Sequence, residues 1–344
     1  MRTQTMHSTL KYSAGLLALI IAPAVIYPGL LMKFLCFALF ACAYNILAGY
    51  TRLMSFGHAA MFGGAAYLSG YCVMRYGVGL EMVLLIGLLS GALIGLVMGA
   101  LAIRRDGVYF TMVTLALAQL MYFVWLQAPF TGGEDGLQGI PRPKLGGVIP
   151  ISTTLEMYYL VLALFALSFV AINRLINSPF ANVLKAIKDN EPRAISLGYE
   201  VNRYKLLAFV LSSAFSGLAG AMKSTLVLGL ATLPDMHWTM SGVVVLMCLV
   251  GGIGTALGPV VGAAVIVLLE NRLGDMGAAI AAWTGIDQLK VLAESTGTAM
   301  GIIFMIMVLM FRRGIVGELA VRLNVRRSMA PEAKPVAPVA GEAR

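Results

Sequence analysis

Charged residues are scarce in this 344-residue chain. Asp, Glu, Lys and Arg make up 12% of the sequence, hydrophobic residues make up 59%, and the mean hydropathy is +0.86. A soluble globular domain carries about 25% charged and about 45–50% apolar residues. The shortage of charge excludes a cytosolic enzyme, a nucleic-acid-binding protein and a disordered regulator. It indicates a membrane protein that crosses the bilayer several times and has lipid as one partner.

Residues for metal binding and catalysis are also few. The chain holds three histidines and four cysteines, and no two cysteines have C-x-x-C spacing. We therefore expect buried, unreactive thiols and no metal site. The motifs H-E-x-x-H and G-x-S-x-G do not occur, and in the stretch 217–224 Met222 replaces the second glycine of a phosphate-binding loop. We expect no catalytic residue and no bound cofactor; if transport is driven by ATP, the ATPase must be another polypeptide.

Apolar runs account for most of the length. A membrane-spanning helix needs about 20 apolar residues, and the loops between the runs are too short for a separate catalytic domain. The sequence predicts an all-α polytopic membrane protein of about ten transmembrane helices. The range is eight to ten, because the eighth and ninth runs are short and would also fit a broken hairpin. The runs are 12–31, 32–50, 58–74, 80–103, 108–127, 157–172, 206–228, 240–254, 258–269 and 298–311.

The first run has two interpretations. Ala22-Pro23-Ala24 would suit a signal-peptide cleavage site, but the run is longer than the 7–15 residues of an ordinary signal peptide core, and another run follows at once. We therefore favour a retained first helix.

Basic residues are unevenly divided between the two sets of loops. With the N-terminus in the cytoplasm, 18 of the 25 lysines and arginines lie on the cytoplasmic side, and the outer loops 128–156 and 270–294 are net acidic. This distribution predicts that both termini are cytoplasmic. We expect a membrane domain over residues 1–311 and a basic tail over 312–344, disordered from about residue 330.

Two glycine repeats predict close packing of helices. The first comprises Gly87, Gly91, Gly95 and Gly99, which recur every four residues and leave one helix face without side chains. The second comprises Gly254, Gly258 and Gly262. It also fits a broken helix beside a transport pathway, because unwound backbone at membrane depth needs protein or water next to it.

Ionisable side chains in or beside the runs are few, and Lys223 and Glu270, both near outer ends, are the candidates for a role within the membrane. We expect each to extend toward the membrane surface, with a place on the pathway as the second interpretation. His58 follows a turn and is expected to be a hydrogen-bonded residue at a helix start. Few buried carboxylates or histidines remain for coupling transport to an ion gradient.

The loop 177–205 predicts a pair of short helices. Ser178 and Pro179 suit a helix start, apolar residues recur at helical spacing up to Ile187, and Gly198 suits the end of a second helix. The apolar residues have no membrane in which to be buried. We favour a docking surface for a cytosolic partner over a helical hairpin that lies on the surface.

This loop resembles the coupling loop of branched-chain amino-acid ABC-transporter permeases of the LivM type. The similarity rests on the residues 178–180, 184–191, 194, 197–198 and 203–209. Five further segments resemble the family and follow one another in the family's order. They are 45–50, 55–67, 107–116, 131–141 and 251–263.

The resemblance implies an importer in a bacterial inner membrane that depends on a periplasmic binding protein. Its partners would be a second homologous permease, two cytosolic ATPase subunits and the solute-binding protein. The residues expected to contact the ATPase are Ser178, Pro179, Phe180, Leu184, Ala186, Glu191, Ala194, Leu197 and Gly198. Those expected at the pathway and its gate are Ser55, Phe56, Gly57, His58, Gly251, Gly252, Gly254, Thr255, Gly258 and Pro259. Those expected to face the binding protein are Thr131, Gly132, Gly133, Asp135 and Gly136.

The preferred function is ATP-driven import of leucine, isoleucine and valine. Three alternatives remain: a permease of the same family for urea or short amides, a secondary carrier with glycine-rich broken helices, and a structural membrane subunit. The lack of buried carboxylates argues against the secondary carrier.

Overall fold

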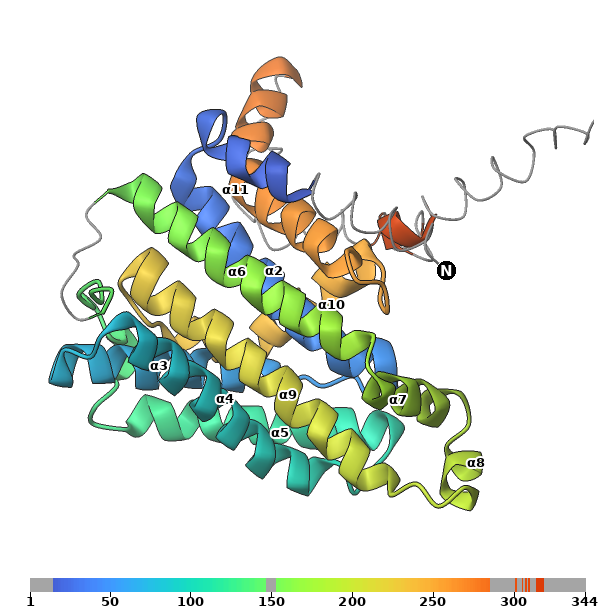
Figure 1. The fold of residues 1–344 in the computed structure, drawn as a ribbon. Coiled ribbons are helices and arrows are strands. Elements are labelled where there is room, and N and C mark those ends of the chain that lie inside the picture. The colour runs from blue at the N-terminus through green and yellow to red at the C-terminus, as the bar shows by residue number, and fades with distance from the viewer. Residues whose placement is uncertain are drawn as a thin grey trace, which may run out of the picture.

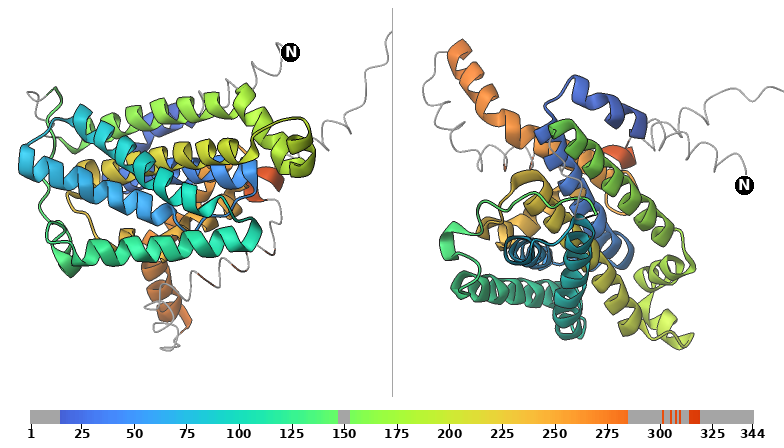
Figure 2. Two further views of the ribbon diagram at one scale, coloured as in Figure 1. Left: turned by 90° about the horizontal axis from the view of Figure 1, so that it is seen from below. Right: turned by 60° about the vertical axis from the view of Figure 1, so that its left-hand side comes forward.

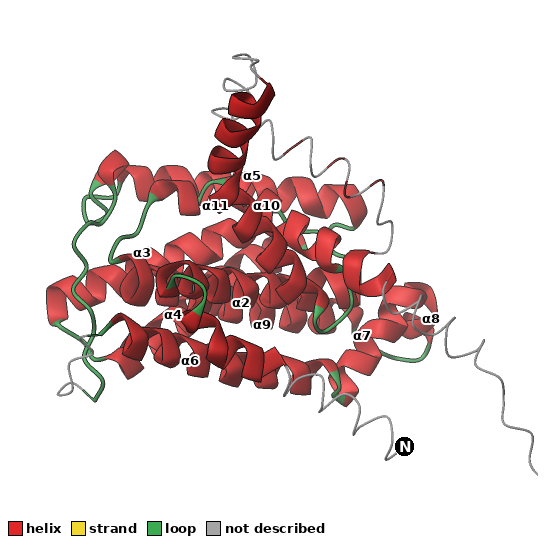
Figure 3. Ribbon diagram, turned by 90° about the horizontal axis from the view of Figure 1, so that it is seen from above, coloured by secondary structure: helices red, strands yellow, loops and turns green. Residues whose placement is uncertain are grey.

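The computed structural model describes residues 15–146, 153–284, 301, 305, 307, 309 and 314–318, and all regular elements in them are helices (Figure 3). Eight of the ten predicted runs lie wholly or mainly on these helices, and the first, 12–31, is divided between a short helix and the start of α2. The tenth, 298–311, falls outside the described residues except for four positions. Five helices in this part of the chain are long and apolar enough to cross a membrane. The α-helices are α2 (Pro28–Thr51), α3 (His58–Tyr76), α4 (Leu80–Ala102), α5 (Gly107–Gln127), α6 (Thr154–Ile176), α7 (Pro179–Asp189), α8 (Glu191–Ser196), α9 (Val201–Met222), α10 (Trp238–Gly251) and α11 (Gly258–Thr284).

Helix α2 lies inside the bundle and packs against α6, α9, α10 and α11, whereas α3 and α4 pack against α9 (Figure 1). Nearly all of its residues after Met32 are buried. The sequence placed a boundary between residues 31 and 32. The structure instead turns the chain after a short helix, Gly15–Ala24, and starts α2 at Pro28, whose missing N–H suits the first helical position. Lys33 therefore lies in α2, where its ammonium is 3.2 Å from the Glu270 carboxylate.

The predicted glycine strip on α4 is confirmed as a packing surface against α9. A Cβ added to Gly91 would lie 2.5 Å from the backbone oxygen of Ser213, and one added to Gly217 would lie 2.4 Å from the backbone oxygen of Gly87. Backbone meets backbone here. Because lipid provides no hydrophobic driving force between helices, close van der Waals contact of this kind holds the two helices together.

The substitution Gly217→Ala tests this packing. We expect a loss of about 1–3 kcal/mol of stability, because the new methyl group would overlap the α4 backbone, which cannot yield as a side chain could. The matched control is Gly242→Ala on α10, where nothing lies within 4 Å of the added Cβ. There we expect a gain in stability of up to about 1 kcal/mol, because alanine has the better helix propensity. Thermal unfolding in detergent measures both variants. A Gly217→Ala protein as stable as the Gly242→Ala protein would contradict the packing.

Helix α11 differs from its prediction. The sequence ended the ninth run at residue 269 and assigned 270–294 to an outer loop, but the helix continues to Thr284. Its end projects beyond the other helices (Figure 2). Two of the charged residues that suggested a loop, Glu270 and Arg272, are exposed on this helix and do not end it, and Glu270 pairs with Lys33.

The two connecting regions of interest lie at opposite ends of the bundle (Figure 1). Helices α7 and α8 form one end. The loop after α5 forms the other, and it contains a 3-10 turn, η2 (Gly133–Asp135). An antiparallel bridge between Leu137 and Ala231 joins that loop to the connection between α9 and α10.

Candidate functional site

The helix pair predicted in the loop 177–205 is confirmed as α7 and α8. Ser178 precedes α7, but its hydroxyl donates to the Leu175 backbone oxygen at 2.6 Å and does not cap α7. Asn190 caps α8 by accepting from the Arg193 backbone N–H at 3.1 Å. Gly198, with φ of +86°, follows α8 in the left-handed conformation that glycine adopts freely.

Most of the apolar face of α7 is not exposed, which corrects the expectation of an open apolar helix pair. Leu184 packs into the main core, and Ile187 packs with Ala194 and Val201 in a small separate core. Phe180 stacks on Tyr204 of α9 at 5.9 Å between ring centroids. The chain itself covers these residues because α9 lies close enough to α7, a long-range contact that helical periodicity does not reveal.

The exposed apolar side chains of this region lie on and just after α8. Ile195 is 58% exposed and Leu197 is 69% exposed, and the predicted contact residue Ala186 is exposed on α7. Glu191 is bound within the chain, since its carboxylate accepts from Lys205 at 2.7 Å.

Lys205 was not predicted as a site residue, yet it anchors this end of the bundle. Its side chain is only 3% exposed, and its ammonium also donates to Asp106 at 2.9 Å. Lys205 thus joins α9, α8 and the turn before α5. Local patterns carry no signal for this role, because the two acids are 14 and 99 residues away.

The first predicted gate segment, 55–58, is buried and hydrogen-bonded. The Ser55 hydroxyl accepts from the Gly57 N–H at 3.1 Å, and the Phe56 N–H donates to Thr114 at 3.2 Å. His58 is confirmed at the start of α3, with Nε2 2.8 Å from the Ser212 hydroxyl.

The Ser212 hydroxyl donates to the Ala43 backbone oxygen at 2.6 Å. It therefore accepts from His58, which places the ring proton on Nε2.

The second predicted gate segment forms a glycine-rich turn, residues 252–257, between α10 and α11. Gly252 and Gly254 have φ of +119° and +80°, which a residue with a Cβ rarely adopts. The Thr255 hydroxyl donates to the Gly252 oxygen at 2.8 Å and accepts from the Gly258 N–H at 3.0 Å. Gly251 packs directly on Gly258, and Pro259 follows as the second residue of α11. The second glycine strip thus joins the two arms of this hairpin.

Adjacent residues of α2 bring these two segments together. The ring of Tyr44 meets the ring of His58 at 4.9 Å between centroids. The next residue, Asn45, accepts from the Gly254 N–H at 2.8 Å and donates to the Thr255 oxygen at 3.0 Å. The structure therefore places both predicted gate segments against one turn of α2.

The predicted outer segment is a tight loop that is tied to the bundle. Thr131 is buried and its hydroxyl donates to the Trp125 and Ala128 oxygens at 2.7 Å. Gly132, Gly133 and Gly136 all have positive φ. Asp135 and its neighbour Glu134 are both exposed in this loop, so two acidic side chains are available on its surface.

Lys223 does not extend to the membrane surface, which corrects the prediction. Its side chain is buried and forms an ion pair with Asp235, which is also buried. The ammonium lies 5.3 Å and 5.6 Å from the ring centroids of Phe37 and Phe62. The segment Lys223–Leu228 is a π-helix, a form found frequently at functional sites. Asp235 escaped sequence reasoning because it lies in a short turn outside the apolar runs.

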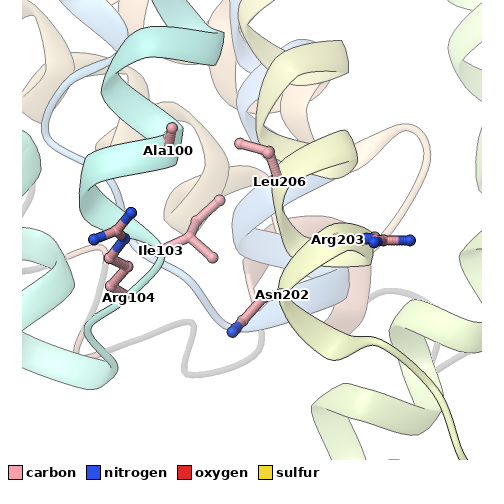
Figure 4. Close-up of a pocket in the computed structure, with 7 residues that line it drawn as sticks. Ala100, Ile103, Arg104, Asn202, Arg203 and Leu206 are labelled. Carbon is pink, nitrogen blue, oxygen red and sulfur yellow. The ribbon is translucent and has the colours of Figure 1, made fainter.

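A groove of about 240 Å³ lies between the ends of α4 and α9 nearest α7. Its floor includes Ala100, Ile103 and Leu206, and Figure 4 shows Ile103 and Leu206 on the facing sides of the two helices. Asn202 points toward the same gap, whereas Arg203 projects from the other side of α9 and pairs with Glu200. The groove brings none of the predicted gate residues together.

These helices and glycine-packed contacts define a multi-pass helical membrane protein. Residues 26–311 match the family model described as "Branched-chain amino acid transport system / permease component". The chain belongs to this family of ABC-type transport permeases, which are transport components and not enzymes. Membership implies, in general terms, ATPase and binding-protein partners.

The chain is similar to permeases named for more than one solute. The chain is 25% identical over 299 residues to the "High-affinity branched-chain amino acid transport system permease protein LivM" of Escherichia coli (strain K12), which covers 78% of this chain and 70% of the relative. It is 29% identical over 198 residues to the "Autoinducer 2 import system permease protein LsrC" of Klebsiella pneumoniae, covering 55% of this chain and 53% of the relative. No solved structure matches.

Proposed function

We propose that this chain is a permease subunit of an ATP-driven, binding-protein-dependent importer of branched-chain amino acids. It would work with a second homologous permease, two cytosolic ATPase subunits and a periplasmic binding protein. The bundle would cross a bacterial inner membrane about ten times, with both termini in the cytoplasm, where the basic loops are concentrated.

One observation carries the proposal. Helices α7 and α8 lie at the opposite end of the bundle from the loop 128–140. The Glu191 carboxylate ties α8 to Lys205 of α9, and a bridge from Leu137 to Ala231 ties the loop to the connection between α9 and α10. A transporter driven by ATP on one side and supplied by a binding protein on the other needs a contact surface at each end. The exposed Ile195 and Leu197 suit the ATPase contact, since exposed apolar side chains mark interaction sites.

The solute class is supported by the chain's shortage of charge and by its relatives. The bundle offers Lys223 and Asp235 as buried charges, and they neutralise one another, so a zwitterionic or neutral solute would meet little net charge. Selection among such solutes would then rest with the binding protein. The relative named for autoinducer 2 import shows that likeness to this family extends to permeases for other solutes.

Uptake by a strain lacking its own branched-chain amino-acid permeases tests the solute. We expect that expressing this chain with its partners restores accumulation of radiolabelled leucine, and that excess isoleucine or valine competes whereas urea does not. Accumulation of labelled urea, with no effect on leucine, would replace the amino-acid assignment by the urea or amide alternative.

A further inference from the structure

Helix α7 is attached to the central helix by a charged hydrogen bond. The Lys188 ammonium, in the last turn of α7, donates to the Gly49 backbone oxygen at 2.7 Å. Gly49 lies in the last turn of α2, where backbone oxygens have no partner within the helix. A cation at this end is also favoured by the helix dipole. Lys188 therefore fills a position that α2 leaves open.

The same turn of α2 holds the glycine-rich turn on its other side. A Cβ on Gly49 would lie 2.9 Å from the Cα of Gly254, so the two backbones are in direct contact. The Asn45 carboxamide bonds Gly254 and Thr255 through its oxygen and its nitrogen, and the Tyr50 hydroxyl donates to the Gly254 oxygen at 3.3 Å. Three polar contacts thus fix a turn whose backbone conformation depends on glycine.

A second contact also joins α7 to α2. The Lys185 ammonium lies 5.5 Å from the ring centroid of Tyr50, within the range of a cation–π interaction. Both lysines of α7 therefore reach residues of α2 that contact Gly254.

We infer that Lys188 and Asn45 are positioning residues that make α7, the end of α2 and the glycine-rich turn move as one body. Displacement of α7 by a partner would displace the hairpin of α10 and α11 at its turn. This inference rests on the proposed function, which supplies the partner that moves α7. Neither residue was predicted from the sequence as part of a site, because their acceptors are 139 and 210 residues away.

The test measures leucine uptake and ATP hydrolysis together in proteoliposomes that contain the whole transporter. In Lys188→Met and Asn45→Leu we expect solute transported per ATP to fall about two- to thirtyfold, the range for coupling energies of 0.5–2 kcal/mol. ATP hydrolysis and ATPase association should remain. Lys188→Arg keeps a donor and should restore the ratio. The double variant should transport no less solute per ATP than the more impaired of the two single variants, because both substitutions interrupt one connection.

Arg193→Met is the matched control, because Arg193 is an exposed base of α8 without an ion pair among the residues that the structure describes. An unchanged ratio in Lys188→Met, or a proportional fall of uptake and hydrolysis, overturns the inference. If Asn45→Leu fails to fold, Asn45→Asp takes its place in the same test. It keeps the acceptor for the Gly254 N–H and removes the donor to the Thr255 oxygen.

A second readout separates this inference from the proposed function. If the unsubstituted transporter shows no ATP-linked uptake, the proposed function fails, and hydrogen exchange then decides the inference without any transport. Faster exchange of the Gly254 amide in Lys188→Met, but not in Arg193→Met, supports the connection. Equal exchange in the two variants overturns it.

Discussion

Replacing Lys223 with methionine is expected to lower the stability of the bundle by about 3–5 kcal/mol, the cost of leaving one member of a buried ion pair without its partner. Asp235 would remain as a buried carboxylate beneath the outer loop, and the cation–π contacts with Phe37 and Phe62 would be lost as well. Thermal unfolding in detergent, followed by size exclusion, measures the loss.

Two controls make this prediction specific. Lys33→Met removes a partly exposed ion pair with Glu270 and is expected to cost about 0–1 kcal/mol. The double variant Lys223→Met/Asp235→Leu removes both buried charges and should recover most of the stability, because apolar replacement of a whole buried pair is often neutral. A Lys223→Met protein as stable as Lys33→Met would contradict the buried pair.

Replacing Ile195 and Leu197 together with serine is expected to abolish co-purification of the ATPase subunits. These side chains present the exposed apolar surface of α8, and truncation of a residue at the centre of an interface costs about 2 kcal/mol or more, which is roughly a thirtyfold loss of affinity. The loss of binding should leave thermal stability unchanged, because neither side chain is buried within the chain.

The conservative double variant Ile195→Val/Leu197→Met retains the apolar area and should keep the ATPase bound. Equal recovery of ATPase with the serine and the conservative variants would show that this surface is not the docking site. Loss of ATPase with both would contradict an apolar contact and indicate a requirement for the shape of these side chains.

The sequence was sufficient for the elements that depend on local patterns. The glycine strip of α4 follows from its spacing, and the helix pair after Ser178 follows from apolar periodicity with Pro179 and Gly198 at its two ends. The helix start at His58 follows from the turn before it. All of these signals act within a few residues. The boundary at Pro28 was missed although proline marks it, because two apolar runs meet there without a charge between them. Periodicity cannot separate such runs.

Contacts between distant segments were beyond the sequence. The burial of Lys223 depends on Asp235, and that of Lys205 depends on Asp106 and Glu191. A lone basic residue near a predicted span end has the same local pattern whether it reaches the membrane surface or a buried acid. The connection from Lys188 to the glycine-rich turn likewise becomes visible only when α2 is placed between them.

The central claim is that this chain transports solute only when partner subunits hydrolyse ATP. Purified transporter in vesicles, with ATP inside and leucine-loaded binding protein outside, tests it most directly. The account predicts leucine accumulation that requires both ATP and the binding protein, stops with a non-hydrolysable ATP analogue and persists with a protonophore. Accumulation without ATP that a protonophore abolishes would contradict it and identify a secondary carrier.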